Sequence, residues 1–471
     1  MGILDTPVGP QISQALKLPR RRERPSAAIA GLTVDKVMTT PPTVGAPATT
    51  SAIAGGVNWL PLKLGVNTGD ATAVDPAAPF DYIGASAGKQ QGTTFPLYNY
   101  MVWDSPSHPN LQSAPYRARF HFDGTVMEIL MSVYANLPYQ IYVDGQAVAA
   151  SAASLGSNQS VSYIPLTFAS RAPRLIEVVS ANPFGGVRTQ PTDTIWKPAS
   201  VGGPRCIILG DSYTGGTGAD ASGITGWAQK FAAIMGWPDT WAAGVGGSGY
   251  LNAGQGTTFR SRVAADITAN NPDIVIVAGG HNDTSYTTAA IQAEAALLFA
   301  AIKSGSPKAK LIVVGPMGAA NAQASYAAMQ TAIFAAAAGV ADLTIDTLTP
   351  NWFAGVGFIG TNRTVTDGVT NSTTTITSAM AAFVAGDVNR VVSGAGIPAG
   401  AKIASVTNST TAVLSIAATA SASGVTLALT NQRGDGNDDY YIWTDNVHPS
   451  QAGHDYIARR NASPVTAWLS S

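Results

Sequence analysis

The strongest constraint on the fold is a short apolar run that ends in a Gly-Asp-Ser turn, at residues 205–213. Residues 206–209 have the length and unbroken hydrophobicity typical of a strand buried in a parallel sheet. Ser212 follows at the carboxyl end of this strand, where open α/β sheets build their ligand sites. We therefore expect a parallel α/β sheet with Ser212 at its functional edge.

Composition limits the classes of protein to consider. The 471 residues are 45% hydrophobic and 12% charged, with 27 Lys and Arg against 28 Asp and Glu. The length and the hydrophobic fraction suffice for several globular domains. The near-neutral net charge gives no electrostatic reason to expect binding to nucleic acid. No run approaches the ~18 apolar residues of a membrane span, and residues 1–26 lack the apolar stretch of a signal peptide. The single cysteine, Cys206, lies inside the predicted strand and is interpreted as core.

A βαβ rhythm runs from residue 201 to residue 471 and predicts a doubly wound parallel sheet. The expected strands cover residues 205–209, 240–243, 273–278, 310–315 and 343–346. The expected helices cover residues 226–235, 288–302, 322–338 and 451–468. The rhythm breaks at residues 361–432, which are rich in Thr, Ser, Ala and Val with Phe383 as their one aromatic residue. We interpret this segment as a small β-module inserted into the α/β domain.

The first 200 residues have a different pattern. Residues 1–74 are rich in Pro, Thr, Ala and Gly, and we expect an extended arm or docking segment there. Residues 75–200 alternate in polarity, with hairpin signals at Asp123-Gly124 and Asp144-Gly145, which predicts a β-sandwich or jelly roll. Aromatic side chains of this region could line a carbohydrate-binding face, although core positions are the commoner fate of such residues. They are Tyr98, Tyr100, Trp103, Tyr134, Tyr139 and Trp196.

Four short motifs follow one another along the α/β domain. They are Gly210-Asp211-Ser212-Tyr213, residues 244–250 (Gly-Val-Gly-Gly-Ser-Gly-Tyr), Gly280-His281-Asn282-Asp283 and Asp445-Asn446-Val447-His448-Pro449. The first three follow predicted parallel strands, whose carboxyl ends meet at one edge of the sheet. Each motif alone is weak, and their occurrence together in this order is the informative observation.

The motifs contain the parts needed to attack an ester or amide carbonyl. Such chemistry requires a nucleophile, a base, a group that orients the base, and donors for the oxyanion. Ser212 supplies a hydroxyl and His448 an imidazole, while Asp445 can accept a hydrogen bond from Nδ1–H of that imidazole. The Ser212 N–H, a glycine N–H of the second motif and the Asn282 amide are candidate oxyanion donors.

From about residue 204 to residue 471 the chain resembles the SGNH, or GDSL-type, hydrolase superfamily, which is named after four marker residues. The corresponding residues here are Ser212, Gly247, Asn282 and His448. Gly246 remains an alternative to Gly247 as the oxyanion glycine. The resemblance implies an SGNH-type doubly wound α/β fold with serine esterase activity.

The resemblance also implies further roles. It places Asp445 in the Asp-x-x-His pattern of the catalytic triad and gives Asp211 and Asp283 the role of loop supports. Two positions depart from the family pattern. Tyr213 replaces the Leu of the older motif name, and Ala242 stands where an Asn often precedes the glycine, which leaves the support of that loop open.

Other sites are less favoured by the sequence. Residues 244–249 match the dinucleotide fingerprint G-x-G-x-x-G, but they follow the second strand and open no obvious helix. Residues 435–439 have the oxygen pattern of a calcium loop, but Tyr440 stands where Gly is required and Asn446 where Glu is required. His281 is interpreted as a supporting residue, and the other histidines have no ligand spacing to one another. These are His108, His121 and His454. We predict no catalytic metal and no cofactor.

The inserted module gives a second resemblance. Residues 391–400 and 403–408 resemble a small β-repeat common in tail proteins of phages that infect actinobacteria. This implies an esterase-bearing minor tail protein, located in the virion tail, with other tail proteins as partners and a homo-oligomer allowed. The expected substrate is an acylated polysaccharide or glycolipid at the host cell surface. The alternative is a non-catalytic receptor-binding or structural tail protein on the same scaffold.

Overall fold

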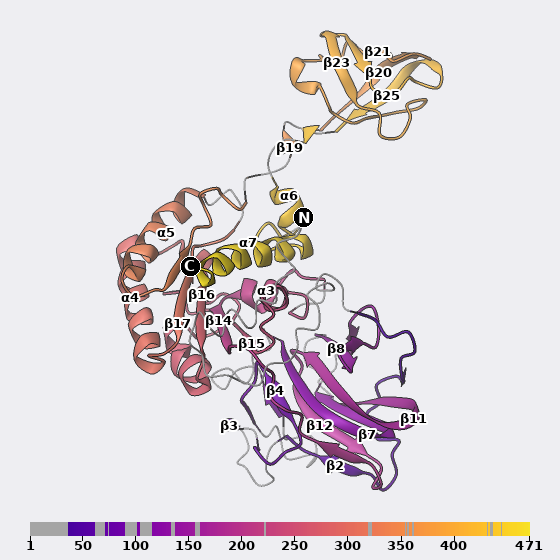
Figure 1. Ribbon diagram of the computed structural model, residues 1–471. Coiled ribbons are helices and arrows are strands. Elements are labelled where there is room, and N and C mark those ends of the chain that lie inside the picture. Colours follow the sequence, from indigo (N-terminus) through magenta and orange to yellow (C-terminus); the bar gives the residue numbers. More distant parts are fainter. Residues whose placement is uncertain are drawn as a thin grey trace. The chain divides into compact units, whose positions relative to one another are not determined.

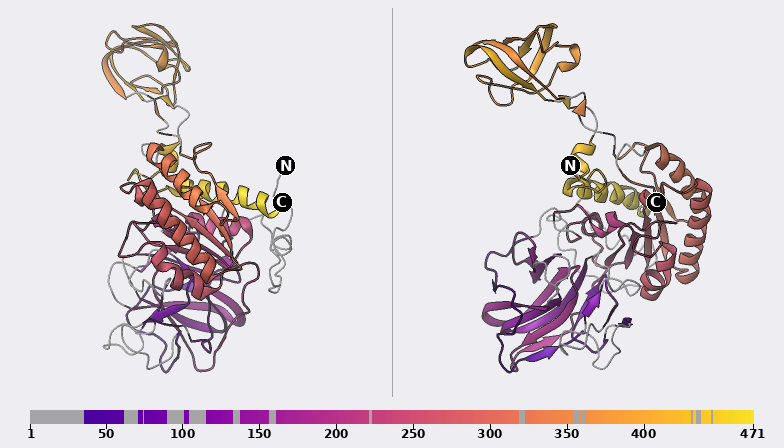
Figure 2. Two further views of the ribbon diagram at one scale, coloured as in Figure 1. Left: turned by 90° about the vertical axis from the view of Figure 1, so that its left-hand side faces the viewer. Right: turned by 180° about the vertical axis from the view of Figure 1, so that it is seen from behind.

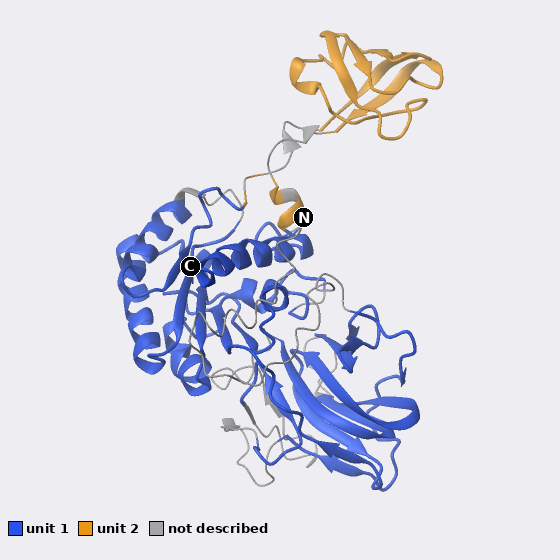
Figure 3. Cartoon of the chain, viewed as in Figure 1, with its two compact units in different colours: residues 1–318, 322–352, 443–471 blue, residues 319–321, 353–442 orange. Residues whose placement is uncertain are grey.

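The computed structural model describes residues 36–61, 71–73, 75–89, 101–103, 115–132, 137–155, 161–220, 223–318, 323–353, 355, 358–359, 362–430, 432–433, 437–443 and 445–471. The chain divides into two compact units, shown in Figure 3. Unit 1 comprises residues 1–318, 322–352 and 443–471, and unit 2 comprises residues 319–321 and 353–442. Among the described residues, no helix is long and apolar enough to cross a membrane.

A five-stranded parallel sheet forms the centre of unit 1, with the order β15-β14-β16-β17-β18 (Figure 1). The strands are β14 (Cys206–Gly210), β15 (Thr240–Gly244), β16 (Ile274–Ala278), β17 (Lys310–Val314) and β18 (Leu343–Ile345). Every residue of β14 and β16 is buried, as expected for strands covered on both faces. The predicted parallel α/β sheet is confirmed, with Cys206 in its core.

Helices cover both faces of this sheet. They are α3 (Trp227–Met235), α4 (Thr288–Gly305), α5 (Gln323–Ala337) and α7 (Gln451–Leu469). Figures 1 and 2 show α4 and α5 on one side of the sheet, with α3 and α7 on the other. Strand order reverses at β14, which pairs with both β15 and β16. The turn after β14 therefore lies at a topological switch point, where ligands bind in open α/β sheets.

The amino-terminal part of unit 1 is a curled antiparallel sheet of 13 strands. Its two longest strands, β7 (Tyr116–Ser132) and β11 (Val161–Ser180), pair along most of their length. The other strands are β1 (Thr43–Val44), β2 (Val57–Trp59), β3 (Ala71–Ala73), β4 (Asp81–Ile83), β5 (Ala87–Lys89), β6 (Met101–Trp103), β8 (Pro138–Val143), β9 (Gln146–Ala147), β10 (Ala153–Ser154), β12 (Phe184–Thr189) and β13 (Thr194–Trp196). Antiparallel strands are thus confirmed, and the finer jelly-roll topology stays a prediction.

The two Asp-Gly signals in this sheet have different outcomes. Asp144 and Gly145 have φ values of 50° and 78° and form the predicted turn between β8 and β9. Gly124 lies within β7, so no hairpin forms at Asp123-Gly124 and that prediction is wrong. The neighbouring strand β11 continues past the same point, with a register shift between Thr167 and Ala172.

Part of the predicted arm belongs to the sheet instead. β1 pairs with β11 and β2 pairs with β12, and Ile53 between them is 3% exposed. These backbone pairs and the buried side chain incorporate residues 43–59 into the β-region, which therefore begins well before residue 75. Residues 1–35, with the basic residues 20–24, lie outside the described part of the chain.

The predicted aromatic face is not assembled as a whole. Tyr139 is buried in the core of the sheet, which is the commoner outcome expected for such residues. Trp196 is 39% exposed and stacks on His121. Trp103 lies in β6, and the remaining candidates, Tyr98, Tyr100 and Tyr134, lie outside the described residues. Among the six, Trp196 is the exposed member that the structure describes.

Unit 2 is a small antiparallel β-structure. Its six-stranded sheet has the order β22-β25-β20-β21-β24-β23, formed by β20 (Arg363–Asn371), β21 (Thr375–Thr377), β22 (Val392–Ser393), β23 (Ile403–Asn408), β24 (Thr411–Leu414) and β25 (Ser421–Leu429). A second pairing joins β19 (Phe358–Ile359) to β26 (Gln432–Arg433). Phe383, Ile403 and Leu427 lie in its own hydrophobic core. The helix α6 (Asp438–Tyr441) follows β26.

Candidate active site

Ser212 begins the short helix α2 (Ser212–Gly215), directly after β14. Asp211 caps this helix, because its Oδ1 accepts a hydrogen bond from the Tyr213 N–H at 2.9 Å. A Cβ atom at Gly210 would lie 2.1 Å from Oγ1 of Thr214, so a side chain there would clash with the turn. The sequence Gly-Asp-Ser thus produces a tight, capped turn that holds Ser212 at the carboxyl end of the strand.

Ser212, His448 and Asp445 form a continuous hydrogen-bonded chain. Ser212 Oγ lies 2.9 Å from Nε2 of His448, and Nδ1 of His448 lies 2.6 Å from Oδ2 of Asp445. A carboxylate partner at Nδ1 favours the tautomer that carries its proton on Nδ1, which leaves Nε2 as the acceptor for the Ser212 hydroxyl. Residues 236 positions apart are thereby brought together in the arrangement of a nucleophile, a base and an orienting acid.

The carboxyl group of Asp445 stays ionised at neutral pH. Partial burial raises its pKa, but hydrogen bonds from the His448 side chain and from the backbone N–H groups of Val447 and His448 lower it, and the net pKa lies below its usual range. Both backbone bonds reach Oδ1 at 2.9 Å, while Oδ2 is the oxygen that meets the imidazole. Each oxygen therefore has a separate function, one in shaping the loop and one in orienting His448.

Hydrogen bonds close the loop that carries Asp445 and His448 and join it to the turn that carries Ser212. The Trp443 N–H donates to the His448 carbonyl at 2.7 Å, and Asn446 adopts a left-handed conformation with φ of 58°. The Tyr213 hydroxyl, next to Ser212, donates to the Val447 carbonyl. The residue that replaces Leu of the older motif name thus links the two halves of the site.

Two neighbouring loops carry the other predicted oxyanion donors. A Cβ atom at Gly246 would be 3.9 Å from Cβ of Ser212, so the Gly246–Gly247 segment borders the nucleophile. Gly247 has φ of 74°, and its carbonyl accepts a hydrogen bond from Nδ2 of Asn252 at 2.6 Å. Nδ2 of Asn282 donates to the Ser248 carbonyl at 2.9 Å, which fixes the Asn282 amide beside the same loop. The assignment of Gly247 rather than Gly246 as the donor stays a prediction.

Asp283 braces the loop that follows the glycines. Its carboxylate accepts hydrogen bonds from the N–H groups of Tyr250, Leu251 and Asn252 at 2.8–2.9 Å. Burial raises the pKa of Asp283, and these three N–H donors oppose the rise. A Cβ atom at Gly249 would lie 2.3 Å from the carboxylate, so the close approach requires glycine there.

Asp211 is in a more strongly desolvated position than the other carboxylates of the site. Burial raises its pKa to about 7, with Asp283 adding to the rise and the Tyr213 N–H and Arg262 opposing it. Its bond to Tyr213 is a cap of the nucleophile helix, and its carboxyl group does not belong to the Ser212–His448–Asp445 chain.

The remaining histidines have other surroundings. His281 contacts the Tyr326 hydroxyl through Nδ1, and burial, followed by the nearby His448, lowers its pKa. His454 accepts from the Trp227 N–H and donates to the Thr217 carbonyl, and burial lowers its pKa to about 4. His108 lies outside the described residues. In the described part of the chain, no group of three or more His, Cys, Asp or Glu side chains is arranged to hold a metal ion.

The glycine-rich loop differs from the dinucleotide-binding template. After residue 249 the chain makes no helix until Arg260–Arg262, so the glycine-rich loop does not open the helix that a dinucleotide site requires. Residues 434–436 of the calcium-like segment lie outside the described residues.

Sequence reasoning missed several contacts that shape the site. Arg262, Ser248 and Tyr326 belong to none of the predicted roles, yet Arg262 binds Ser248 and Tyr326 contacts His281. A signal was present only for Ser248, which lies within the glycine-rich motif. The other two are distant in sequence from the motifs whose residues they contact, so only the fold reveals them.

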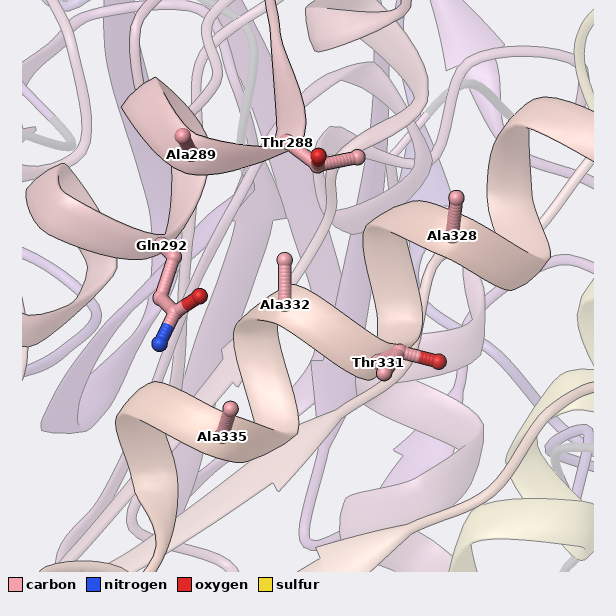
Figure 4. Close-up of a pocket in the computed structure, with 7 residues that line it drawn as sticks. All are labelled: Thr288, Ala289, Gln292, Ala328, Thr331, Ala332 and Ala335. Carbon is pink, nitrogen blue, oxygen red and sulfur yellow. The ribbon is translucent and has the colours of Figure 1, made fainter.

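A groove between α4 and α5 lies apart from these residues (Figure 4). Small and uncharged side chains line it, namely Thr288, Ala289, Gln292, Ala328, Thr331, Ala332 and Ala335. The lining contains no imidazole, carboxylate or thiol, and it shares no residue with the Ser212–His448–Asp445 chain. It is therefore not a candidate catalytic centre.

The chain is similar to one family model and to several solved structures. Residues 208–352 match the family model of the GDSL-like lipase/acylhydrolase family. The solved structure of the salicylyl-acyltransferase SsfX3 from a tetracycline biosynthetic pathway is similar, with 14% identity and a TM-score of 0.51, covering 84% of this chain and 96% of that one. A family two carbohydrate esterase from Cellvibrio japonicus has 14% identity and a TM-score of 0.44, covering 59% of this chain and 88% of its own.

A further solved structure, the acetyl xylan esterase Est2A from the rumen bacterium Butyrivibrio proteoclasticus, has 12% identity and a TM-score of 0.39, covering 59% of this chain and 90% of its own. A search of curated proteins gave no match. The family match begins within β14 and includes the first three motifs, and the structure adds His448 and Asp445 from the fourth. The α/β part of this chain is therefore similar to GDSL-like lipases and acylhydrolases over residues 208–352.

Proposed function

We propose that the protein is a serine esterase that removes acyl groups from an acylated polysaccharide or glycolipid of a bacterial envelope. The observation that carries the catalytic part is the chain of hydrogen bonds from Ser212 through His448 to Asp445, at 2.9 and 2.6 Å. These distances are those expected between a nucleophile, its general base and the group that orients the base.

The first half of the proposed reaction forms an acyl-enzyme. Ser212 Oγ attacks the ester carbonyl carbon while its proton passes to Nε2 of His448, and Asp445 stabilises the resulting imidazolium. The N–H groups of Ser212 and Gly247 and the Asn282 amide donate to the oxyanion. The imidazolium then returns the proton to the leaving alkoxide, so the sugar hydroxyl departs as a neutral alcohol and the acyl group remains on Oγ.

The second half returns the free enzyme. Water gives a proton to Nε2 of His448 and attacks the acyl carbonyl, and the same donors hold the second oxyanion. Collapse of this intermediate breaks the bond to Ser212 Oγ, which takes the proton back. One ester and one water yield one alcohol and one carboxylic acid, with no cofactor required.

Exposed aromatic side chains support a glycan as the substrate. Trp443 is 48% exposed and lies two residues before Asp445, and Tyr286 is 40% exposed and lies three residues after Asp283. The apolar C–H faces of sugar rings pack well on such aromatic surfaces, whose polar edges remain in water. Both aromatic residues are on segments that also carry proposed catalytic groups, which suits a sugar bound beside its scissile ester.

Two substrates test this proposal together. Wild-type protein should release carboxylic acid from an O-acetylated polysaccharide and nitrophenol from 4-nitrophenyl acetate, whereas Ser212→Ala should release neither above background. Trp443→Ala should raise KM for the polysaccharide by about fivefold or more and leave the nitrophenyl ester unaffected. Leu297→Ala, which alters an exposed apolar side chain of α4, is the matched control. Equal acid release by wild type and Ser212→Ala would refute the esterase proposal.

Acyl transfer to an alcohol is a second candidate. It is favoured by the similarity to SsfX3, which extends over 84% of this chain and thus includes part of the antiparallel sheet. The acyl-enzyme would be the same, and a hydroxyl would replace water in the second half of the reaction. Adding methanol or a monosaccharide acceptor would distinguish the two: a transferase forms new ester in preference to free acid.

The proposed location in a virion tail rests on the sequence of residues 391–408 alone. It predicts that antibodies against the protein label purified virions and that the purified chain binds host cells. Absence of both would favour a bacterial esterase with the same chemistry.

A further inference from the structure

Arg262 is a fully buried cation next to the proposed active site. It lies in a short helical turn, Arg260–Arg262, and its side chain is 0% exposed. Arg260, in the same turn, is 47% exposed and pairs with Glu294 at the surface. Burying a guanidinium is costly unless it gains several well-placed partners, so the contacts of Arg262 indicate what its burial stabilises.

Two of these contacts join the ends of neighbouring strands. Nη2 of Arg262 donates to the Gly210 carbonyl at 2.8 Å, and Nη1 donates to the Ala243 carbonyl at 2.9 Å. Gly210 is the last residue of β14 and precedes the Asp211–Ser212 turn, while Ala243 is next to the end of β15. The guanidinium therefore fixes the two points from which the nucleophile turn and the glycine loop depart.

A third contact extends to the remaining oxyanion donor. Nη2 of Arg262 lies 3.3 Å from Oγ of Ser248, and this hydroxyl also donates to the Val245 carbonyl at 2.7 Å. The carbonyl of Ser248 accepts the hydrogen bond from the Asn282 amide. Arg262 thus contacts, directly or through Ser248, all three segments that carry proposed oxyanion donors.

The charge and shape of Arg262 suit this arrangement. Asp266, four residues later and also buried, lies 3.4 Å from Nη1 and compensates the charge. The rigid planar guanidinium presents its N–H groups at fixed angles, so it can hold two carbonyls and a hydroxyl at once. The ammonium of a lysine is a compact point charge and would not span the same acceptors.

We infer that Arg262 is a positioning residue for the oxyanion-binding groups. It holds them in place through its hydrogen bonds to the Gly210 carbonyl and to Ser248. It does not belong to the Ser212–His448–Asp445 chain. Its removal leaves every group of the Ser212–His448–Asp445 chain present but lets the donors, the Ser212 N–H included, drift from the geometry that matches the transition state. This inference rests on the proposed Ser212 chemistry.

Three variants test it: Arg262→Lys, Ser248→Ala and, as the matched control, Arg260→Gln. Active sites are counted with a fluorophosphonate that labels Ser212, and kcat and KM for 4-nitrophenyl acetate are expressed per labelled site. Arg262→Lys should lower kcat per labelled site by about 10–100-fold with KM changed less than about threefold, because small displacements of catalytic groups cost rate rather than binding. Ser248→Ala should lower kcat per labelled site by about three- to tenfold, and Arg260→Gln should match wild type.

Other outcomes separate the explanations. A lower melting temperature or fewer labelled sites, with kcat per labelled site unchanged in both Arg262→Lys and Ser248→Ala, would show a structural role only and overturn the inference. If Arg262→Lys fails to fold, Ser248→Ala decides, because it removes one hydroxyl and keeps the buried charge. Wild-type protein that is neither labelled nor active would overturn the proposed function, and this inference with it.

Discussion

The site has two halves that are built in opposite ways. The strand-end half consists of Ser212, the glycine loop and Asn282. Buried side chains support it by hydrogen bonds, and they include Asp211, Asp283 and Arg262. In the base loop, Asp445 and His448 lie within three residues of each other and remain partly exposed to solvent. The first half depends on contacts between distant segments, while the second depends on hydrogen bonds within one short loop.

This difference separates two requirements of the chemistry. Oxyanion donors must keep a fixed geometry, which buried, mutually bonded supports provide. The carboxylate that orients the base must stay ionised, and the hydrogen bonds in its loop keep the pKa of Asp445 low despite partial burial. Changes to the base loop should therefore act through ionisation and tautomer, and changes to the strand-end half through geometry and stability.

Among substitutions in the two halves, Asp445→Asn is expected to lower kcat the most. The amide can donate to Nδ1 and stabilise the wrong imidazole tautomer, so kcat should fall by about 10⁴-fold while the protein stays folded. Thermal unfolding should be close to that of wild type, because Val447 and His448 N–H groups can still donate to the amide oxygen. Asp455→Asn, on an exposed part of α7, is the control. A loss of less than tenfold would show that Asp445 does not orient the base.

A smaller effect is expected from Asn282→Ala. Removing one oxyanion donor should lower kcat by about 10²–10³-fold, which is less than loss of the orienting carboxylate. KM should change little, because the donor acts mainly on the transition state. A rise in KM with kcat unchanged would instead make Asn282 a substrate-binding residue.

Asp211→Asn should have its clearest effect on stability, and that effect depends on pH. The folded-state pKa of Asp211, about 7, lies above the ordinary aspartate pKa of 3.8, so its contribution to stability is complete below pH 3.8 and is lost as pH rises through 7. The asparagine variant lacks this titration. Its stability relative to wild type should therefore rise by about 2–3 kcal/mol between pH 5 and pH 8. Urea unfolding at several pH values measures this, and a difference independent of pH would contradict it.

The same contrast explains what the sequence could predict. The βαβ rhythm gave the parallel strands, because buried strands and amphipathic helices have local patterns. Ser212, Asn282, His448 and Asp445 can be proposed from the sequence because each lies in a short motif at a strand end or helix start. Arg262 and Tyr326 were missed because their partners are brought to them only by the fold.

The antiparallel sheet shows the same limit of local signals. Asp144-Gly145 turns the chain, whereas Asp123-Gly124 continues as strand because Pro173 and Ala172 of β11 pair with it. Residues 43–59 have weak local periodicity, yet pairing with β11 and β12 makes strands of them. Tertiary pairing thus overrides a turn signal in one place and creates strands in another.

The central claim is that Ser212 is the nucleophile, and trapping the acyl-enzyme tests it most directly. Wild-type protein is mixed with 4-nitrophenyl acetate, quenched in acid within the first turnovers, and measured by intact mass and peptide mapping. We predict one added acetyl group on the peptide that contains Ser212, with none in Ser212→Ala and a longer-lived adduct in Asp445→Asn than in wild type. Acetylation elsewhere, or equal acetylation of Ser212→Ala, would contradict the account.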